Sequence, residues 1–360
     1  MKPEDVIIEG AVCPVPLPHR KRIVLGHGSG GKLSQDLITR LFLPPFANPV
    51  LNAGDDAGVV EFEAGIRLAI STDSHVVWPL FFPGGDIGRL AVCGTVNDVA
   101  MMGAVPLFLT AGFILEEGLD FEVLEQVVQS MQIAAAEAGV QLIAGDTKVV
   151  QRGKADSLYI NTTGVGLISD GASIGGSRAQ PGDKVFLSGP VGDHGIAVLS
   201  ARGELGFEAM VQSDIAPLNH LVQAILRTAQ EEGSLSDIHV LRDPTRGGVA
   251  TTLNEIARQS NDAILIREDR LPVRPAVAAA CELLGFDPLY IANEGKLIAI
   301  VAPEVAAPVL ETMRRTKYGR EAVEIGEVLA SPAGRVLMKT TIGSTRVVDT
   351  LAGELLPRIC

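Results

Sequence analysis

The sequence has little cysteine, no long apolar run and no excess of basic residues, and each absence removes a class of protein. Its four cysteines (Cys13, Cys93, Cys281 and Cys360) are widely spaced and form no CxxC pair. Neither a zinc cluster nor a disulfide framework is therefore indicated. The start of the sequence lacks the basic residues and apolar stretch of a signal peptide, and every apolar run is interrupted before it reaches membrane-spanning length. These features favour a reducing cytoplasm.

The charge balance is acidic, with 30 Lys and Arg against 43 Asp and Glu and a net charge of −13. Such a surface repels phosphate backbones and anionic lipid, so we expect neither nucleic acid nor a membrane as a partner. A nucleotide carrying Mg²⁺ is a different case, because the metal neutralises much of the phosphate charge. Hydrophobic residues make up 47% of the 360 residues. That content is enough for a folded core, and the length favours two domains over one.

Hydrophobic periodicity predicts two α+β domains of similar size. In the first half, apolar runs predict strands at 67–71, at 106–115 and near residues 141 and 158, and apolar stripes predict helices over 86–102 and 121–138. The second half repeats this style after a Gly/Ser/Pro-rich linker at 171–182. We assign residues 1–40 to an extension that ends in a glycine loop, 41–172 and 173–338 to the two domains, and 339–360 to a C-terminal tail.

The glycine loop, GHGSGGK at 26–32, nearly satisfies two phosphate-binding motifs. The P-loop requires Ser or Thr after its lysine, but Leu33 stands there. The dinucleotide motif requires a βαβ unit, but the chain soon reaches Pro44 and Pro45. We reject both named motifs. Backbone amides without a Cβ in the way can nevertheless wrap a phosphate, although a lone glycine loop is more often a simple turn.

Several acids lie where a metal–nucleotide complex would need them. Asp55 and Asp56 follow Gly54, and Asp73 and Asp146 end apolar strands. Asp98 is the most informative of the acids, because it lies on the apolar stripe of the helix predicted over 86–102, and a carboxylate facing a core is costly unless it is paired or bound to a metal. Each acid alone is more simply a cap or turn residue. Together they favour Mg²⁺ holding phosphates.

In the second half, DPTRGG at 243–248 lies between a predicted strand and a predicted helix, where amides favour anions. NEGK at 293–296 precedes a strand and on its own would be a turn. Cys360 is the last residue of the sequence. Its own carboxylate should raise the pKa of the thiol, so we expect a carrier of a covalent group rather than a hyper-reactive nucleophile.

These segments resemble a known family. The segments GHGSGGK, GDDA at 54–57, NDVAMMGA at 97–104 and AGDTKVV at 144–150 resemble the ATP-binding half of the aminoimidazole ribonucleotide synthetase superfamily. DPTRGG, NEGK and the terminal PRIC resemble one branch of it, the carbamoyl dehydratases of hydrogenase maturation. The resemblance covers nearly the whole chain. It implies a two-domain PurM-like fold of the α+β class, with a ferredoxin-like ATP-binding domain, an α/β C-terminal domain and a flexible tail.

The resemblance also implies an activity: ATP-dependent dehydration of a carbamoyl group on Cys360, from S-carboxamide to S-cyanate, which supplies the cyanide ligand of the NiFe-hydrogenase iron centre. It implies ATP and Mg²⁺ as cofactors and a homodimer as the assembly. The implied partners are a carbamoyltransferase (HypF) that loads the cysteine and a HypC–HypD complex that receives the cyano group.

By the same resemblance each site residue receives a role. The catalytic residues would be Cys360, Lys148 and Glu294, the last two handling amide protons or developing charge. The residues expected to bind the nucleotide are Gly28, Ser29, Gly30, Gly31, Lys32, Asn97, Asp146 and Arg246. The expected metal ligands are Asp55, Asp56, Asp73, Asp98 and Asp243.

Two kinds of alternative remain open at this point. One is another ATP-dependent synthetase or kinase of the superfamily, although selenophosphate synthetase would want a reactive cysteine just before the glycine loop, and Cys13 is too far from it. The purine enzyme has no use for a terminal cysteine. The other is a non-catalytic scaffold whose tail is only a docking peptide. It predicts tail-dependent partner binding without ATP turnover.

Overall fold

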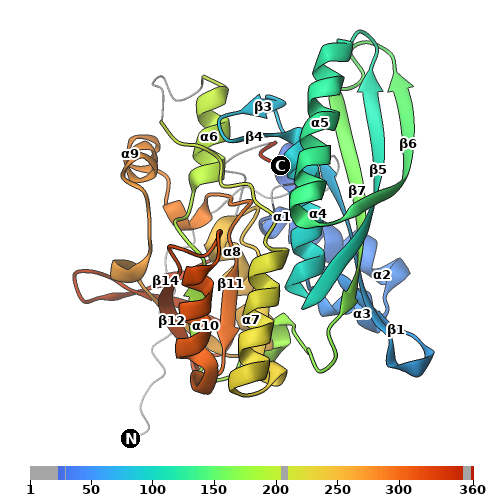
Figure 1. Cartoon of the computed structure of the whole chain (residues 1–360). Coiled ribbons are helices and arrows are strands. Elements are labelled where there is room, and N and C mark those ends of the chain that lie inside the picture. Colours follow the sequence, from blue (N-terminus) through green and yellow to red (C-terminus); the bar gives the residue numbers. More distant parts are fainter. Residues whose placement is uncertain (1–22, 29, 204–209, 352–357) are drawn as a thin grey trace, which may run out of the picture.

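The computed structural model describes residues 23–28, 30–203, 210–351 and 358–360. Ser29, Cys13 and most of the 1–40 extension lie outside these ranges. The chain forms two halves, each built on one large sheet, as expected for the α+β class (Figure 1). No helix among the described residues is long and apolar enough to cross a membrane.

The first sheet has five strands in the order β1-β2-β7-β5-β6, and all neighbours are antiparallel except the parallel pair β5 and β6. Its strands are β1 Gly58–Glu61, β2 Arg67–His75, β5 Ala104–Glu116, β6 Gln141–Val150 and β7 Leu158–Ile168. Alternate residues of β7 are buried, as expected for a sheet with one covered face. The small hairpin of β3 (Phe81–Phe82) and β4 (Gly85–Asp86) follows β2.

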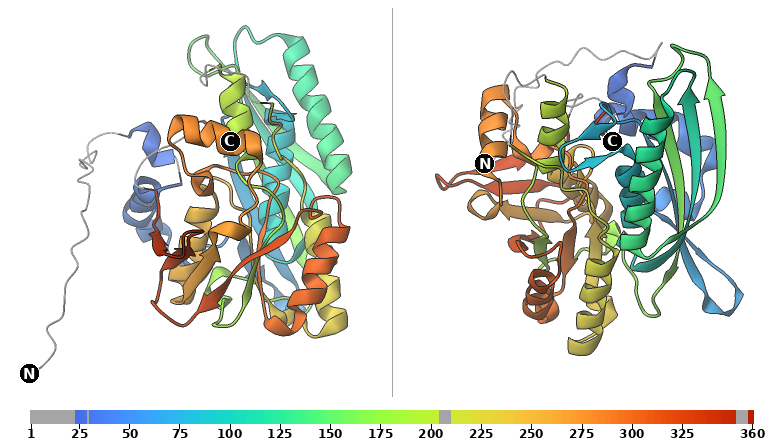
Figure 2. Two further views of the ribbon diagram at one scale, coloured as in Figure 1. Left: turned by 90° about the vertical axis from the view of Figure 1, so that its left-hand side faces the viewer. Right: turned by 45° about the horizontal axis from the view of Figure 1, so that its top comes forward.

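Two helices cover the inner face of this sheet: α4 Ile87–Met101 and α5 Phe121–Ala138. The Asp86 carboxylate caps α4 by accepting bonds from the amides of Gly88 and Arg89. Gly139, in the left-handed conformation (φ 74°), ends α5. Both helices lie between the first sheet and the second half of the molecule (Figures 1 and 2). Consequently α4 is buried on nearly all sides.

The second sheet has seven strands in the order β14-β13-β10-β12-β8-β11-β9. The strands are β8 Lys184–Leu187, β9 Ile238–Arg242, β10 Ala263–Arg267, β11 Ile298–Val301, β12 Val323–Leu329, β13 Val336–Lys339 and β14 Thr345–Val348. The hairpin of β13 and β14 corrects our expectation of a tail from residue 339, because the sheet continues to Val348.

Helices cover both faces of the second sheet. One face carries α8 Gly248–Ser260, and the other carries α7 Asn219–Glu232 and α10 Pro303–Arg315. Two further helices, α6 Asp193–Ala201 and α9 Pro275–Leu284, pack against each other in a separate cluster. The alternation of strand side chains decides which helix each residue meets: Val185 and Leu187 belong to the core under α8, whereas Phe186 belongs to the core under α7 and α10. Before the first sheet lie α1 Lys32–Leu37, a π-helical turn Ile38–Phe42, α2 Leu43–Phe46 and α3 Pro49–Ala53.

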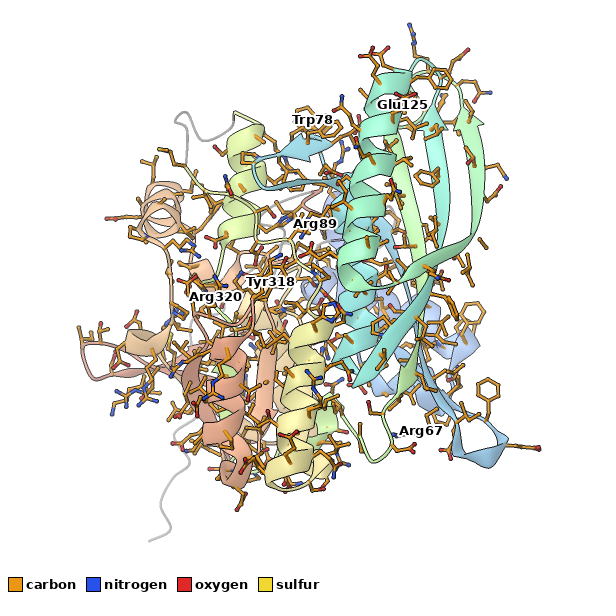
Figure 3. The ribbon with its side chains drawn as sticks, viewed as in Figure 1. Arg67, Trp78, Arg89, Glu125, Tyr318 and Arg320 are labelled. Atoms are coloured by element: carbon orange, nitrogen blue, oxygen red, sulfur yellow. The ribbon has the colours of Figure 1, made fainter. Side chains whose placement is uncertain are left out.

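The two halves are joined by a polar contact as well as by packing. Arg89 on α4 and Tyr318 after α10 face each other at the junction (Figure 3), and Glu137 at the end of α5 lies between them. Its carboxylate is 2.9 Å from Arg89 and 2.7 Å from Lys317. Burial alone would raise the pKa of Glu137. The hydrogen bonds from Lys317, Tyr318 and Arg89 outweigh burial and lower this pKa to about 2.

Candidate functional site

An open cavity of about 280 Å³ lies where the glycine loop, α4 and the start of α8 meet. Six of the residues that the sequence singled out line it: Gly28, Gly30, Asp56, Asp98, Asp243 and Arg246. They come from four separate stretches of the sequence, so the fold brings the glycine loop, the first-half acids and the DPTRGG segment to one place.

Asp98 faces this cavity from α4. The Ser71 hydroxyl on β2 donates a 2.6 Å hydrogen bond to its carboxylate. Burial raises the pKa of Asp98 well above its usual range, and the neighbouring Asp243 and Asp73 raise it further. The site thus concentrates negative charge that the protein alone does not neutralise.

Asp56 and Asp243 complete the acidic wall. Arg242 at the end of β9 lies 2.6 Å from Asp56 and 2.8 Å from Glu255. Burial raises the pKa of Asp243 to about 6, although Arg242 opposes the shift. Among the described residues, one carboxylate oxygen of Asp56 and one of Asp243 are buried without a hydrogen-bond partner. Buried oxygens of this kind need a donor or a cation.

No three His, Cys, Asp or Glu side chains within the described ranges are grouped as a ready-made metal site. Asp73 is partly exposed and lies 3.8 Å from both His75 and Arg246. Asp55 lies outside the cavity lining, because its carboxylate accepts a 2.9 Å bond from the Gly176 amide in the segment between the halves. Of the expected ligands, Asp56, Asp98 and Asp243 therefore line the cavity, and Asp55 and Asp73 lie outside its lining.

The glycine loop is held by Arg246. The Arg246 guanidinium donates to the Gly28 carbonyl at 3.2 Å, and a side chain at Gly30 (φ +77°) would meet Arg246 atoms at 3.1 Å. Gly31 is the N-terminal cap of α1. Lys32 points away from the cavity: its side chain is 46% exposed and lies 3.2 Å from Asp349. The loop therefore lines the cavity with His27, Gly28 and Gly30 and not with its lysine.

The end of the chain is seated beside this cavity. Cys360 is only 8% exposed, and an oxygen of its terminal carboxylate accepts a 3.2 Å bond from the Val76 amide, just after β2. The Trp78 amide likewise donates to the Arg358 carbonyl at 3.3 Å. Burial is the main cause that raises the pKa of the Cys360 thiol. The sequence predicts the same direction, but from the residue's own carboxylate. Arg246 opposes the shift, and the Glu294 carboxylate, which is hydrogen-bonded to the thiol, adds to it.

Glu294 thus lies at the sulfur atom. It is 4% exposed, and one of its carboxylate oxygens has no hydrogen-bond partner within the described part of the chain. Burial raises its pKa well above the usual range, with Asp243 and Asp73 contributing. A carboxylate of raised pKa is suited to accept a proton near neutral pH.

Asn97 lies elsewhere than expected. It is 1% exposed and bridges the two halves. Its amide nitrogen donates to the Ala216 carbonyl at 3.1 Å, and its oxygen accepts from the Leu218 amide at 2.8 Å. A second bond reaches the Glu294 carbonyl at 3.4 Å. Its contacts in this chain position the Glu294 loop.

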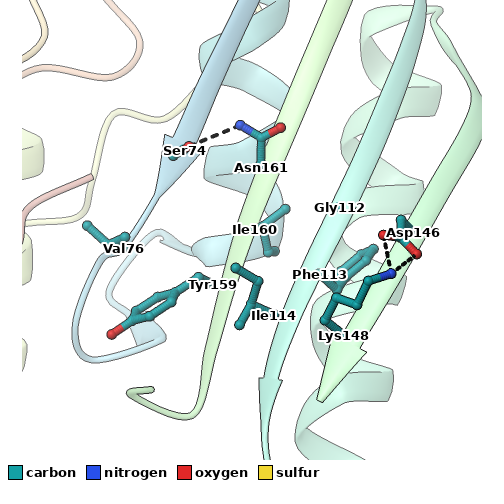
Figure 4. A pocket seen from close by; sticks show the side chains of 10 residues that line it. All are labelled: Ser74, Val76, Gly112, Phe113, Ile114, Asp146, Lys148, Tyr159, Ile160 and Asn161. Atoms are coloured by element: carbon teal, nitrogen blue, oxygen red, sulfur yellow. Dashed lines mark hydrogen bonds and ion pairs between the residues drawn. The ribbon is translucent and has the colours of Figure 1, made fainter. Parts of the chain in front are cut away.

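Asp146 and Lys148 also lie apart from the acidic cavity. Both are on β6, each is 68% exposed, and their side chains pair at 2.7 Å (Figure 4). They line a separate pocket of about 370 Å³ that extends across the sheet to Val76. Two strands, β7 and β5, separate β6 from β2. At about 4.8 Å per strand, Lys148 lies roughly 14 Å from the strand that ends beside Cys360.

Sequence reasoning missed several residues of the cavity. These are Ser34, Ile38, Arg242, Thr251, Thr252 and Glu255; His27 and Thr245 lie inside the GHGSGGK and DPTRGG segments but received no role of their own. Arg242 had a usable signal, because it directly precedes Asp243 at the end of a predicted strand. Thr251 and Glu255 are one helical turn apart on α8, but their direction depends on how α8 packs, which no local pattern reveals.

Comparisons with known proteins identify the family of the chain. The family model "AIR synthase related protein, N-terminal domain" matches residues 54–168, and "AIR synthase related protein, C-terminal domain" matches residues 180–339. The carbamoyl dehydratase HypE of Bradyrhizobium diazoefficiens is 53% identical over 336 residues, covering 93% of this chain and 95% of the relative.

Solved structures are similar over comparable lengths. A structure of HypE in complex with ATP has a TM-score of 0.77 at 51% identity and covers 94% of this chain and 100% of its own. A HypE–HypF complex has a TM-score of 0.82 at 48% identity and covers 88% of this chain and 99% of its own.

Proposed function

The chain belongs to the AIR synthase related family and, within it, to the HypE carbamoyl dehydratases, and from that premise we propose that it uses ATP to dehydrate a carbamoyl group carried on its own Cys360. The product is the S-cyanate, which supplies cyanide for the iron centre of NiFe-hydrogenase. One observation carries the proposal: the buried sulfur of Cys360 lies against Glu294, with Arg246 joining that seat to the glycine loop and the acidic cavity.

The chemistry explains why these groups belong together. The carbamoyl oxygen is a poor leaving group. When it attacks the γ-phosphorus of ATP, an O–P bond forms, the bond to the β-phosphate oxygen breaks and ADP leaves. The C–O bond then breaks, phosphate departs and a nitrile remains on sulfur, while the nitrogen loses both of its protons. The balance is S-carboxamide plus ATP giving S-cyanate, ADP, phosphate and a proton.

The residues near the sulfur suit these steps. Glu294 is the base that lies against the sulfur in this chain, and we assign it a proton of the amide nitrogen. Arg246 donates a hydrogen bond to the Gly28 carbonyl, and its positive charge lies near Cys360. We assign it the stabilisation of the negative charge that develops on the carbamoyl oxygen. We expect Gly28, Ser29, Gly30 and Gly31 to hold phosphate oxygens through their amides, for which the Gly30 amide would have to give up its 2.9 Å bond to the Ser34 hydroxyl.

The acids fit Mg²⁺. A divalent cation would give the unpartnered oxygens of Asp56 and Asp243 a partner. It would also favour the charged form of Asp98, whose pKa is raised by burial and, in addition, by repulsion from Asp243 and Asp73. We propose that Asp56, Asp73, Asp98 and Asp243 hold the ion, with Asp55 supporting from the segment that it ties to Gly176. When bound, Mg²⁺ neutralises phosphate charge and makes the γ-phosphorus more electrophilic.

We propose that two copies pair through the outer face and edge of the first sheet. Nine of the ten residues of β6 are exposed, and a long exposed edge strand is usually covered in the working assembly. Apolar side chains add to this face: Phe108, Ile114, Leu142, Ile143 and Val149 are all at least 40% exposed. Asp146 and Lys148 would then lie at the interface, near a site of the second copy, where Lys148 would act on the amide and Asp146 on the nucleotide complex.

The solved HypE–HypF complex supports a carbamoyltransferase of the HypF type as the partner that loads Cys360. The family relationship extends the proposal to a HypC–HypD complex as the acceptor of the cyano group. We place the reaction in the cytoplasm.

Mass spectrometry of the C-terminal peptide tests the function. Carbamoylated protein given Mg-ATP should lose the mass of one water at Cys360, and ¹⁸O placed in the carbamoyl group should appear in phosphate. Cys360→Ala should abolish both, whereas Cys281→Ala, at another buried thiol, should abolish neither. If ATP hydrolysis proceeds equally without carbamoylation, another synthetase or kinase of the superfamily is the better assignment. If no ATP is hydrolysed under any condition, the scaffold alternative holds.

A further inference from the structure

The side chain of His194 contacts the last residues of the chain directly. His194 is the second residue of α6 and is fully buried. Its Nε2 atom lies 2.7 Å from the carbonyl oxygen of Ile359, the residue before Cys360. Because a carbonyl oxygen can only accept, Nε2 carries the proton and donates it. Figure 1 shows the C-terminus beside α6 and the β3–β4 hairpin.

The other faces of the His194 ring are fixed as well. Nδ1 lies 2.9 Å from the Ser213 hydroxyl oxygen, which itself accepts a 3.3 Å bond from the Ile215 amide. The Ser213 proton is therefore available to Nδ1, and this arrangement selects the tautomer that donates from Nε2. The Phe82 ring meets the imidazole edge-on at 5.6 Å between centroids. The ring has one orientation, and that orientation points at Ile359.

The elements that hold His194 also hold Glu294. At the start of α6, the Gly192 amide donates to the Asn293 side chain at 2.8 Å, and the Gly195 amide donates to the Ala292 carbonyl at 3.2 Å. Next to Ser213, the Asp214 carboxylate accepts a 3.1 Å bond from the Glu294 amide. Two short connections thus fix the position of the Ile359 carbonyl relative to the Glu294 backbone: one through the start of α6, and one through Ser213 and Asp214.

We infer that His194 is a positioning residue of the proposed reaction: by holding the Ile359 carbonyl, it places the sulfur of the next residue against the Glu294 carboxylate. Arg202 also donates to the Arg358 carbonyl, at 2.5 Å, but from a partly exposed position, where water competes for the bond. The inference rests on the proposed function for the meaning of the seat, by which we mean the buried position of Cys360 beside Glu294. The seat itself can be measured without catalysis.

The test compares the rate of alkylation of Cys360 by iodoacetamide in the full-length, uncarbamoylated protein, read peptide by peptide. A seated thiol is shielded and has a raised pKa, so alkylation reports the unseated fraction. His194→Ala should speed Cys360 alkylation about tenfold, the loss expected for one buried hydrogen bond. His194→Gln retains a donor and should restore most of the protection. Ser213→Ala, which removes only the partner of Nδ1, should give a smaller change in the same direction.

Cys281 is the internal control, because it is buried in a core cluster that does not include the last residues, whereas Cys93 lies in the same cluster as Ile359 and Cys360 and reports on general loosening there. The matched control variant is His239→Ala, which removes a buried histidine that pairs with Asp183 at 2.7 Å. It should leave Cys360 protected. Unchanged Cys360 alkylation in His194→Ala, or equal acceleration at all three cysteines, would overturn the inference.

Dehydration of pre-carbamoylated protein gives a second readout. His194→Ala should lower kcat and leave the KM for ATP unchanged, because His194 does not line the acidic cavity. A raised KM with unchanged kcat would contradict a positioning role. If alkylation responds as expected but wild-type protein never forms the cyanate, the proposed function fails and the seat remains.

Discussion

Lys32 Nζ lies 3.2 Å from the Asp349 carboxylate, and this ion pair joins the glycine loop to the segment that leads to the C-terminus. The Lys32 amide reinforces the link by donating to the Leu351 carbonyl at 3.1 Å. A lysine expected at the phosphates is thus engaged by a carboxylate, and a nucleotide would have to compete for it.

Asp349→Asn should therefore release Lys32 and lower the KM for ATP by about two- to fivefold, the range expected for an exposed ion pair. Lys32→Ala should raise the KM. Asp36→Asn, which removes the exposed pair with Arg40 further along the same N-terminal helical region, is the control and should change nothing. Equal KM values in all three variants would show that Lys32 has only a structural role.

Asp98→Asn separates binding from folding. The substitution removes a carboxylate that Asp243 and Asp73 already disfavour, so the melting temperature without nucleotide should stay the same or rise. Affinity for Mg-ATP, measured by calorimetry, should fall by about tenfold or more. Ser71→Ala keeps the carboxylate and should have a smaller effect. Loss of the fold together with binding would identify Asp98 as structural instead.

Glu137 should make the stability of the protein depend on pH in the acid range. Its pKa is about 2 in the folded protein against an ordinary value of 4.5. Because the folded value is the lower one, its contribution is present above about pH 4.5 and is lost as the pH falls toward 2. Glu137→Gln should cost about 1–2 kcal/mol at pH 7, after allowance for partial exposure, and almost nothing near pH 2.

Denaturant unfolding at several pH values measures this difference. Glu311→Gln removes an exposed ion pair with Arg315 and should have little effect at any pH. A pH-independent cost for Glu137→Gln would argue against the network with Arg89 and Lys317.

Lys148 and Cys360 should complement each other between copies. Each of Lys148→Ala and Cys360→Ala should be inactive alone. In an equal mixture that exchanges subunits, half of the dimers are mixed and each has one complete site, so about a quarter of wild-type activity should return. Mixing Glu294→Gln with Cys360→Ala should restore nothing, because that pair lies in one chain. Absence of recovery in the first mixture would place Lys148 within its own chain's site.

Local patterns were sufficient for much of the fold. The helix predicted over 121–138 has those bounds in the structure, and the one predicted over 86–102 spans 87–101, because capping and apolar spacing act within a few residues. A helix at α7 was not among the predictions, although its Leu221, Ile225 and Ala229 have helical spacing. By contrast, α6 has no continuous polar face, since most of it is buried, and its sequence therefore lacks helical periodicity.

The candidate site divides in the same way. Asp56 could be singled out from the acidic pair after Gly54 and Asp98 from its charge on an apolar stripe, whereas the ligand role of Asp243 came from the family resemblance. The seat of Cys360 could not, because Val76 and His194 are more than a hundred residues away in sequence and make contact only in the folded chain. The separation of Lys148 from Cys360 likewise depends on strand order, which residue spacing does not encode.

The placement of α4 has a consequence for anyone who wishes to cut this molecule into modules. Ile87 and Leu90 belong to the core of the first sheet, whereas Ala100 and Met101 of the same helix belong to the core under α7 and α10. Neither half can unfold without removing α4 from the core of the other half, so calorimetry should record one cooperative transition. An isolated N-terminal fragment should expose the apolar residues of α4 and aggregate.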